Sequence, residues 1–177
     1  VDPENGKLLW SHPHKTEWDI NPNTPIYHDG HVLIYSGYDT GAQMLKLSDD
    51  GSSITKVWEN NVLDSQIGAA VLVDGRLYAS GHKNRGWHGV DWATGKTLFT
   101  DNPFRKGPII AADDKLILYS EGGDFALADP TAESLNVISQ FEIELGSKQH
   151  WAHPVVKDGR LYVRHGDVLM VYDVAAE

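Results

Sequence analysis

Histidine and tryptophan gather in three short stretches of the sequence. They are His12-Pro13-His14, the run from Gly81 to His88, and His150-Trp151-Ala152-His153. Imidazole is the commonest metal ligand in proteins, so each histidine pair is a candidate metal site. A zinc site needs four ligands, or three and an open position, and no third ligand of recognisable spacing accompanies either pair. We therefore expect no metal site and interpret these histidines as hydrogen-bonded loop residues.

Motifs for other kinds of chemistry do not occur in the sequence. There is no Gly-x-Ser-x-Gly nucleophile elbow, no phosphate-binding loop and no dinucleotide-binding fingerprint. The paired carboxylates Asp49-Asp50 and Asp113-Asp114 lie where turns are expected, and solvated turns commonly carry such pairs. No catalytic residue is predicted, which leaves enzyme activity open but unsupported by these residues.

A repeat determines where these stretches are placed. The sequence Asp158-Gly159-Arg160-Leu161-Tyr162 also occurs at 74–78, and looser copies begin at Asp29 and Asp113. The four copies start at residues 29, 74, 113 and 158, so they are 45, 39 and 45 residues apart. Self-similarity at such a period is typical of repeat architectures.

Each copy of the repeat predicts four strands. Asp-Gly between two apolar runs favours a two-residue type I′ hairpin turn, which joins the first two strands. A third strand follows a glycine-rich gap, and a fourth ends on an aromatic residue, at Trp58, Phe99 and Phe141. We expect these aromatics to pack between neighbouring blades. The fold class is therefore predicted to be all-β, a β-propeller of four-stranded antiparallel blades.

The chain is predicted to form one propeller domain over residues 1–177. Complete blades are expected at about 24–59, 68–100 and 107–143. A fourth blade at about 153–173 lacks its last strand, whereas residues 6–12 resemble a last strand without a blade. The chain thus holds about four blades, half of an eight-blade ring. Alternation within the strands predicts a core of Trp58, Val71, Val73, Leu77, Phe99, Ile110, Leu116, Val155, Leu161 and Val163.

Composition narrows the class of protein. Hydrophobic residues make up 41% of the chain, which is enough for a packed core. The net charge of −10 argues against nucleic acid as a partner. No stretch is long and apolar enough to predict a membrane span. The absence of cysteine leaves the redox compartment open.

The pattern Asp-x-x-x-Gly-Lys-x-Leu-aromatic, found at residues 91–99 and preceded by Asp-Gly-Arg-Leu-Tyr hairpins, resembles the repeat of pyrroloquinoline-quinone (PQQ) enzymes. The resemblance covers nearly the whole chain. It implies a propeller of seven or eight blades, as in quinoprotein dehydrogenases, the outer-membrane assembly lipoprotein and secreted bacterial proteins that bind no quinone. It also implies that the chain is a fragment of a larger propeller, located in the periplasm, outside the cell or at the cell envelope.

The resemblance also implies what a quinone site would need. Family enzymes stack PQQ between a tryptophan and a vicinal disulfide, beside a calcium ion held by carboxylate and amide ligands. This chain has no cysteine, and we identify no matching set of calcium ligands. No cofactor is predicted, and PQQ with calcium belongs only to the alternative function below.

One face of the propeller is the expected binding surface. We label the four strands of each blade A to D in chain order. The loops that join strand D to strand A of the next blade lie on the same face as the loops that join B to C, around the mouth of the central channel. Exposed tryptophans there, at positions 18, 87 and 151, would be natural contact anchors. The predicted ligand-binding residues are Trp18, His82, Arg85, Trp151 and His153.

Two functions follow from these observations. The first is a non-catalytic module of an exported bacterial protein that binds a protein or carbohydrate ligand through the channel-mouth face. The alternative is part of a PQQ-dependent dehydrogenase whose cofactor residues lie mostly outside this segment. Titration of the full-length protein with PQQ and calcium separates the two.

The split blade predicts how the chain assembles, because an unpaired sheet edge favours pairing. Residues 6–12 are expected to pair with the strand near 168–173. Pairing between two chains gives an eight-blade homodimer with closed two-fold symmetry, which we favour. Pairing within one chain gives a four-blade ring, and in a longer protein the rest of the propeller completes the blade.

Overall fold

The structure is a computed structural model that describes residues 1–68 and 70–175. Blade 1 contains β1 (Ile26–His28), β2 (His31–Ser36), β3 (Gly41–Leu47) and β4 (Ile54–Asn60). Blade 2 contains β5 (Val71–Val73), β6 (Arg76–Gly81), β7 (Gly86–Asp91) and β8 (Thr97–Asp101). Blade 3 contains β9 (Ile109–Ala112), β10 (Lys115–Tyr119), β11 (Asp124–Pro130) and β12 (Leu135–Glu142). Blade 4 contains β13 (Val155–Lys157), β14 (Arg160–His165) and β15 (Val168–Asp173).

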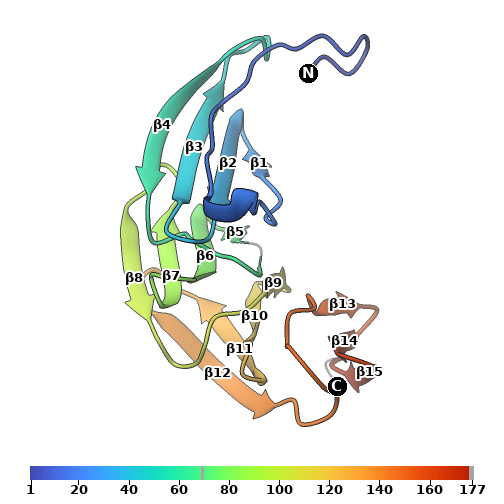
Figure 1. Cartoon of the computed structure of the whole chain (residues 1–177). Helices are drawn as coiled ribbons and strands as arrows, with labels where there is room; N and C mark the ends of the chain where they lie inside the picture. The colour runs from blue at the N-terminus through green and yellow to red at the C-terminus, as the bar shows by residue number, and fades with distance from the viewer. Residues whose placement is uncertain (69, 176–177) are drawn as a thin grey trace.

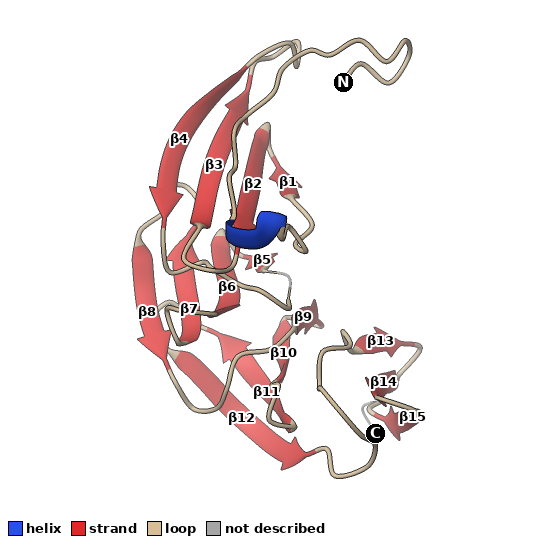
Figure 2. Cartoon of the chain, viewed as in Figure 1, coloured by secondary structure: helices blue, strands red, loops and turns tan. Residues whose placement is uncertain are grey.

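The blades form an open crescent (Figure 1). In every sheet the strands pair antiparallel in sequence order. Strands β4, β8 and β12 lie on the outer side of the crescent, and β1, β5 and β9 lie on its inner side (Figures 1 and 2). The predicted all-β propeller architecture is confirmed, and the described residues do not close a ring. Within these ranges, no helix has the length and apolar character needed to cross a membrane.

The hairpin turns have the geometry that their sequences predict. In blade 2, Asp74 has φ 47° and Gly75 has φ 71°, and the corresponding pairs in the other three blades also have positive φ. Positive φ at both central residues is the type I′ turn, whose twist matches that of the flanking strands. These local turns fix the register of the first two strands in each blade.

An aromatic side chain from strand D connects each blade to the next. The Trp58 ring of blade 1 covers Gly95 in the turn between β7 and β8, and its Nε1 donates to the Trp92 carbonyl at 3.0 Å. Trp10 repeats the hydrogen bond one blade earlier: its Nε1 donates to the Gly51 carbonyl at 3.2 Å in the turn between β3 and β4, but its ring does not cover that glycine. The N-terminal segment therefore contacts blade 1 as a preceding strand D would.

Residues 2–7 also have the geometry of a turn between strands C and D. The Asp2 amide donates to the Lys7 carbonyl at 2.8 Å, and the Asp91 amide donates to the Lys96 carbonyl at 2.9 Å. Residues 6–12 nevertheless carry no strand, because no strand C lies beside them. They lie at the opposite end of the crescent from β15, which pairs only with β14 among the described strands (Figure 1).

Three apolar clusters fill the three interfaces between blades. Leu77, Phe99, Leu116, Leu161 and Val163 are buried as predicted, whereas Trp58, Val71, Val73 and Ile110 are half-buried. Val155 was expected in the core, but it is 53% exposed. It shares with Leu169 and Val171 the face of blade 4 that no other described blade covers. The prediction was wrong for this residue because its burial depends on a further neighbour.

Trp87 was expected to be an exposed anchor, and this expectation was wrong. The side chain is 1% exposed and packs edge-on against Phe104, with ring centroids 5.6 Å apart. Strand β7 begins at Gly86, so the strand includes Trp87. Trp87 therefore belongs to a strand of blade 2 and not to a loop, and its side chain packs between blades 2 and 3.

We predict that Gly95→Ala destabilises the fold more than Gly75→Ala. Both glycines have φ +71°, so alanine carries a backbone cost of about 1–2 kcal/mol at either position. At Gly95 the new Cβ would also lie 2.5 Å from the Trp58 ring, whereas at Gly75 nothing lies within 4 Å. The steric conflict adds about 1–3 kcal/mol. Urea denaturation measures the difference, and equal losses would show that the aromatic contact does not hold the blades together.

Candidate functional site

A buried carboxylate organises the loops at the channel mouth. Asp64, from the loop between blades 1 and 2, is 0% exposed. Its oxygens accept hydrogen bonds from the backbone amides of His82 at 2.7 Å and Lys83 at 2.9 Å, and from Asp39 at 3.3 Å. A carboxylate is buried at low cost only when it is bonded in this way. Asp64 therefore fixes the B–C loops of blades 1 and 2 relative to each other.

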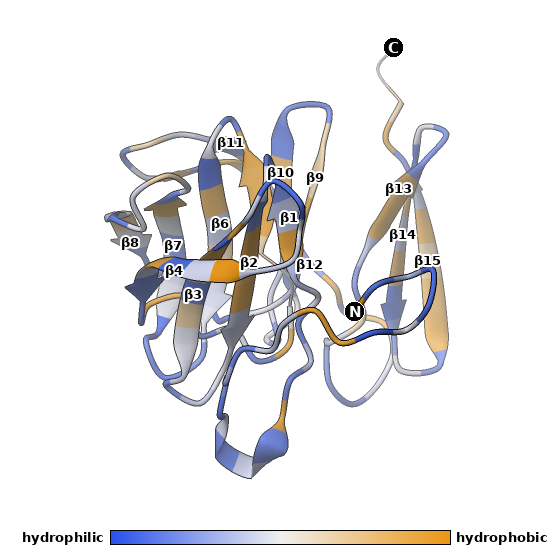
Figure 3. Cartoon of the chain, turned by 90° about the horizontal axis from the view of Figure 1, so that it is seen from above, coloured by the Kyte–Doolittle hydropathy of each residue, from blue (hydrophilic) through white to orange (hydrophobic). Residues whose placement is uncertain are grey.

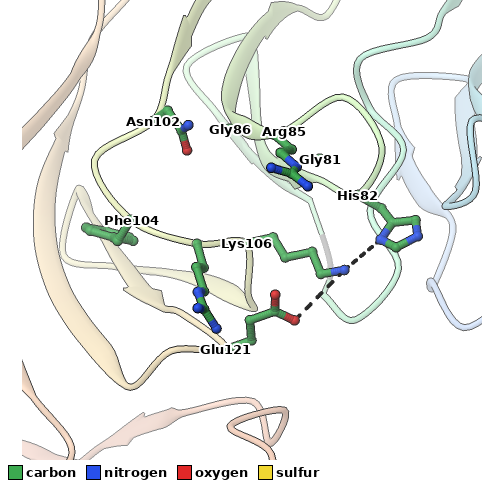
Figure 4. A pocket seen from close by; sticks show the side chains of 9 residues that line it. Gly81, His82, Arg85, Gly86, Asn102, Phe104, Lys106 and Glu121 are labelled. Carbon is green, nitrogen blue, oxygen red and sulfur yellow. Dashed lines mark hydrogen bonds and ion pairs between the residues drawn. The ribbon is translucent and has the colours of Figure 1, made fainter.

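A polar cavity of about 570 Å³ opens beside this carboxylate (Figure 4). It lies between the B–C loop of blade 2 and the D–A loop that follows β8. Three cationic side chains and one carboxylate line it, together with His82, Asn102 and Phe104. The charged residues are Arg85, Arg105, Lys106 and Glu121. We call this the basic cavity.

A second cavity of about 490 Å³ lies on the same face. Its lining includes Ile67 and Tyr38 from blades 1 and 2 and Trp151 from the loop before blade 4. The Trp151 side chain is 48% exposed and offers its ring to a ligand. We call this the aromatic cavity. Its other lining residues are Ile20, Pro22, Asn23, Thr24, Gln66, Gly68 and His153.

A chain of hydrogen-bonded side chains forms the wall between the two cavities. Lys106 Nζ donates to Gln66 Oε1 at 2.8 Å, and Gln66 Nε2 donates to the Tyr38 hydroxyl at 3.0 Å. The Tyr38 ring meets the His82 ring edge-on, with centroids 4.8 Å apart. Residues from two blades thus hold the cavities side by side, so a single ligand can occupy both.

The wall also determines protonation in the basic cavity. Lys106 Nζ lies 2.6 Å from His82 Nδ1, and an ammonium can only donate, so Nδ1 accepts and the neutral His82 ring carries its proton on Nε2. Burial lowers the pKa of His82, and the Lys106 charge lowers it further. Burial also lowers the pKa of Lys106, with Glu121 opposing that shift. The basic cavity therefore contains a partly desolvated ammonium group.

The histidines near residue 150 have structural partners. His150 stacks on His165 with ring centroids 3.5 Å apart, and the Tyr119 hydroxyl lies 2.6 Å from His150 Nδ1. Burial, and then the neighbouring His165, lower the pKa of His150. His12 and His14 contact Gln43 and Ser36 of blade 1. These contacts attach the N-terminal segment and the loop before blade 4 to the sheets.

The structure distributes the predicted ligand-binding residues over three places. His82 and Arg85 line the basic cavity, and Trp151 and His153 line the aromatic cavity. Trp18 lines neither: it is 74% exposed in the 3₁₀ turn η1 (Glu17–Asp19), which projects from the sheets (Figure 3). Glu17 forms an ion pair of 3.6 Å with Lys83, which links this turn to the B–C loop of blade 2.

Four residues of this site were not predicted from the sequence: Tyr38, Gln66, Arg105 and Lys106. Each lies in a B–C or D–A loop, so the loop assignment could have identified them. None lies in a histidine- or tryptophan-rich stretch, which is why the pattern gave no signal. The contacts of Tyr38, Gln66 and Lys106 join residues about 24–40 positions apart in the sequence.

The described residues do not fit the calcium and quinone centre that the repeat implies for its enzymes. Among residues 1–68 and 70–175, no three His, Cys, Asp or Glu side chains come together as a metal site. The chain also has no cysteine for a vicinal disulfide. We therefore derive no chemistry from PQQ in this segment.

His88 makes the fold sensitive to acid. It is 2% exposed, with Nδ1 at 3.0 Å from Thr100 Oγ1 and Nε2 at 2.8 Å from the Asn84 carbonyl. The Nε2–H therefore donates to Asn84, and the neutral ring satisfies both contacts. Burial lowers the pKa of His88.

We predict that the free energy of unfolding decreases as the pH falls below about 6.5, the unfolded pKa of histidine. Below that pH the unfolded chain takes up a proton that folded His88 does not, so acid favours unfolding, and the full stability is present above it. Urea denaturation at pH 7.5 and 5.5 measures the effect. His88→Gln reduces the pH dependence, whereas His28→Gln, at an exposed position, leaves it unchanged. An unaltered slope in His88→Gln would contradict this assignment.

The sequence of this chain matches the profile of a known family. The sequence profile described as "Outer membrane protein assembly factor BamB", of the PQQ repeat type, matches residues 1–166. No curated protein sequence matches the chain.

Solved structures share the fold at low sequence identity. BamB from Moraxella catarrhalis has a TM-score of 0.63 and 12% identity, and the match covers 85% of this chain and 42% of that one. A europium-containing methanol dehydrogenase has a TM-score of 0.60 and 13% identity, over 79% of this chain and 27% of that one. The computationally designed Ika4 protein has a TM-score of 0.62 and 12% identity, over 96% of this chain and 99% of that one.

The chain thus spans less than half the length of the natural propellers it resembles. The resemblance to the PQQ repeat that the sequence indicated is confirmed by a profile match over nearly the whole chain. Its four sheets have the blade arrangement of those propellers. The chain belongs to the BamB-like family of PQQ-repeat β-propellers.

Proposed function

We propose that this chain is part of a protein-binding propeller module of the bacterial cell envelope, and that it contacts its partner through the channel-mouth face. The observation that carries this proposal is the pair of adjoining cavities on that face, held by Asp64 and by the Lys106–Gln66–Tyr38 wall. The family description, an outer membrane assembly factor, favours a protein over a glycan as partner and the envelope as location.

Exposed aromatics on the same face support a contact surface. Trp151 is 48% exposed, and Trp18 is 74% exposed with a backbone φ of 61°, a conformation that bulky residues rarely adopt. Strained and exposed aromatic residues cluster at functional sites more than elsewhere. The two cavities offer charged and aromatic side chains for contact, and binding is the activity that we propose for them.

A photo-crosslinking residue at Trp151 or Trp18 of the full-length protein tests this proposal. We predict covalent adducts with a protein partner in cells from both positions. Asp74 and Thr94, in turns on the opposite face, serve as controls and give none. Adducts from the controls alone would place the contact on the wrong face, and retention on a glycan array with no protein adduct would make the ligand a carbohydrate.

We further propose that two copies of this chain complete each other's split blade in an eight-blade ring. Among the described residues, blade 4 has neither a C–D turn nor a strand D, and residues 2–12 contain a turn of that geometry. Phe141, at the register of Trp58, is 43% exposed, and Gly6, at the register of Gly95, has nothing within 4 Å of an added Cβ. Phe141 of one copy would therefore cover Gly6 of the other.

Two uncovered apolar faces support the same assembly. Blade 4 exposes Val155, Leu169 and Val171 on its outer face. On the far side of blade 1, Val32 and Ile34 line a cavity of about 320 Å³ beside the N-terminal segment. In a dimer with two-fold symmetry, blade 4 of each copy packs against blade 1 of the other copy. Both apolar faces are then buried, which is favourable.

Light scattering at micromolar concentration tests the dimer. We predict about twice the monomer mass of 19.6 kDa. Gly6→Ala inserts a methyl group under Phe141 and shifts the equilibrium to monomer, whereas Gly30→Ala, with φ +69° and nothing within 4 Å, does not. A folded monomer in the parent chain would show that flanking sequence of a longer protein, and not a second copy, completes the blade.

A further inference from the structure

The basic cavity contains two arginines without partners. Arg85, which Figure 4 labels, and Arg105 both line it. Among the described residues, neither guanidinium group makes a hydrogen bond or an ion pair. Each therefore retains its full set of donors in a fixed planar fork that matches the two oxygens of a carboxylate.

The third cation is only weakly neutralised. The Lys106 side chain is 17% exposed, and its nearest carboxylate oxygen, on Glu121, is 3.9 Å away. That distance is too long for a hydrogen bond. The Lys106 ammonium donates instead to two neutral acceptors, on Gln66 and His82. Three cations thus line a cavity whose only lining carboxylate among the described residues is Glu121, and the nearby Asp64 carboxylate is already bonded to backbone amides.

We propose that the basic cavity binds the carboxylate side chains of an acidic peptide segment in the partner protein. The neighbouring aromatic cavity takes an apolar or aromatic side chain of the same segment. This inference rests on the proposed function and names the chemistry of the partner. Paired arginine forks give bidentate, charge-assisted hydrogen bonds to carboxylates, and Lys106 adds a pre-positioned point charge.

The size and pairing of the cavities favour a peptide over an inorganic anion. Volumes of about 570 and 490 Å³ each fall in the range of pockets that hold organic ligands. An inorganic ion would use only the basic cavity and leave Trp151 and Tyr38 uncovered. A peptide with neighbouring acidic and aromatic residues occupies both cavities across the Gln66 wall.

Fluorescence anisotropy with two labelled, end-blocked peptides tests the inference. One has two glutamates followed by a phenylalanine, and the other has glutamines in place of the glutamates. We expect the acidic peptide to bind at least about tenfold more tightly, and its affinity to fall as salt rises. Arg85→Gln and Arg105→Gln each weaken its binding about tenfold, and the double variant abolishes the preference for glutamate.

A matched variant separates the cavity from overall charge. Arg160→Gln removes one exposed positive charge on blade 4, outside both cavities, and leaves the affinity unchanged. Arg85→Lys keeps the charge but loses the bidentate fork, and it binds with intermediate affinity. Arg85 and Arg105 are exposed, so circular dichroism of these variants matches the parent protein.

Three outcomes would overturn the inference. Equal affinity for both peptides would show that the arginines do not bind carboxylates selectively. Displacement of the acidic peptide by low-millimolar phosphate, with no effect of phenylalanine→alanine in the peptide, would make the cavity an inorganic-anion site. Failure of the acidic peptide to bind, while the Trp151 cross-link to a partner persists, would remove the carboxylate assignment and leave the proposed binding face intact.

Discussion

Contact between one blade and the next is the constraint on which this structure depends. A four-stranded sheet has two faces, and a blade of about 40 residues cannot bury both by itself. Trp58 shows how the chain meets this requirement: its ring covers Gly95 and its nitrogen bonds the Trp92 carbonyl in the next blade. Only glycine fits under the ring at this contact. Where one of them lacks its counterpart, as at Phe141 and Gly6, an apolar surface is left open.

The channel-mouth site depends on this stacking, because its residues come from different blades. Asp64 fixes the loops of two stacked blades relative to each other. Its buried carboxylate accepts hydrogen bonds from backbone amides of both blades. Backbone amides are good partners for this purpose because they do not change with the loop sequence. Side chains such as Arg85 are then free to vary on a rigid frame. Rigid support of this kind lowers the ordering cost of binding.

Local chemistry explains which features the sequence could predict. The Asp74-Gly75 turn needs only its own residues to adopt positive φ, so the hairpins and the blade period were readable. Trp87 was misassigned because its strand extends through pairing with Asp101, a contact made fourteen residues away. Val155 was misassigned because its exposure depends on whether another blade covers it. Lys106 was not predicted because its contacts with Gln66 and His82 are distant in the sequence, and no local sequence pattern indicates them.

The selectivity that we propose for the basic cavity depends on electrostatics at two length scales. The net charge of −10 repels an acidic ligand at a distance, but at physiological salt this field decays over about 8 Å. Inside the cavity the relevant charges are Arg85, Arg105 and Lys106. Solvent screens the charge of Lys106 less, because this side chain is partly desolvated. Lys106 is already held by Gln66 and His82, so it need not reorganise when an anion arrives. In the proposed complex, an acidic segment is therefore retained only when its carboxylates reach these three groups directly. Scattered acidic residues on other proteins gain nothing from the long-range field.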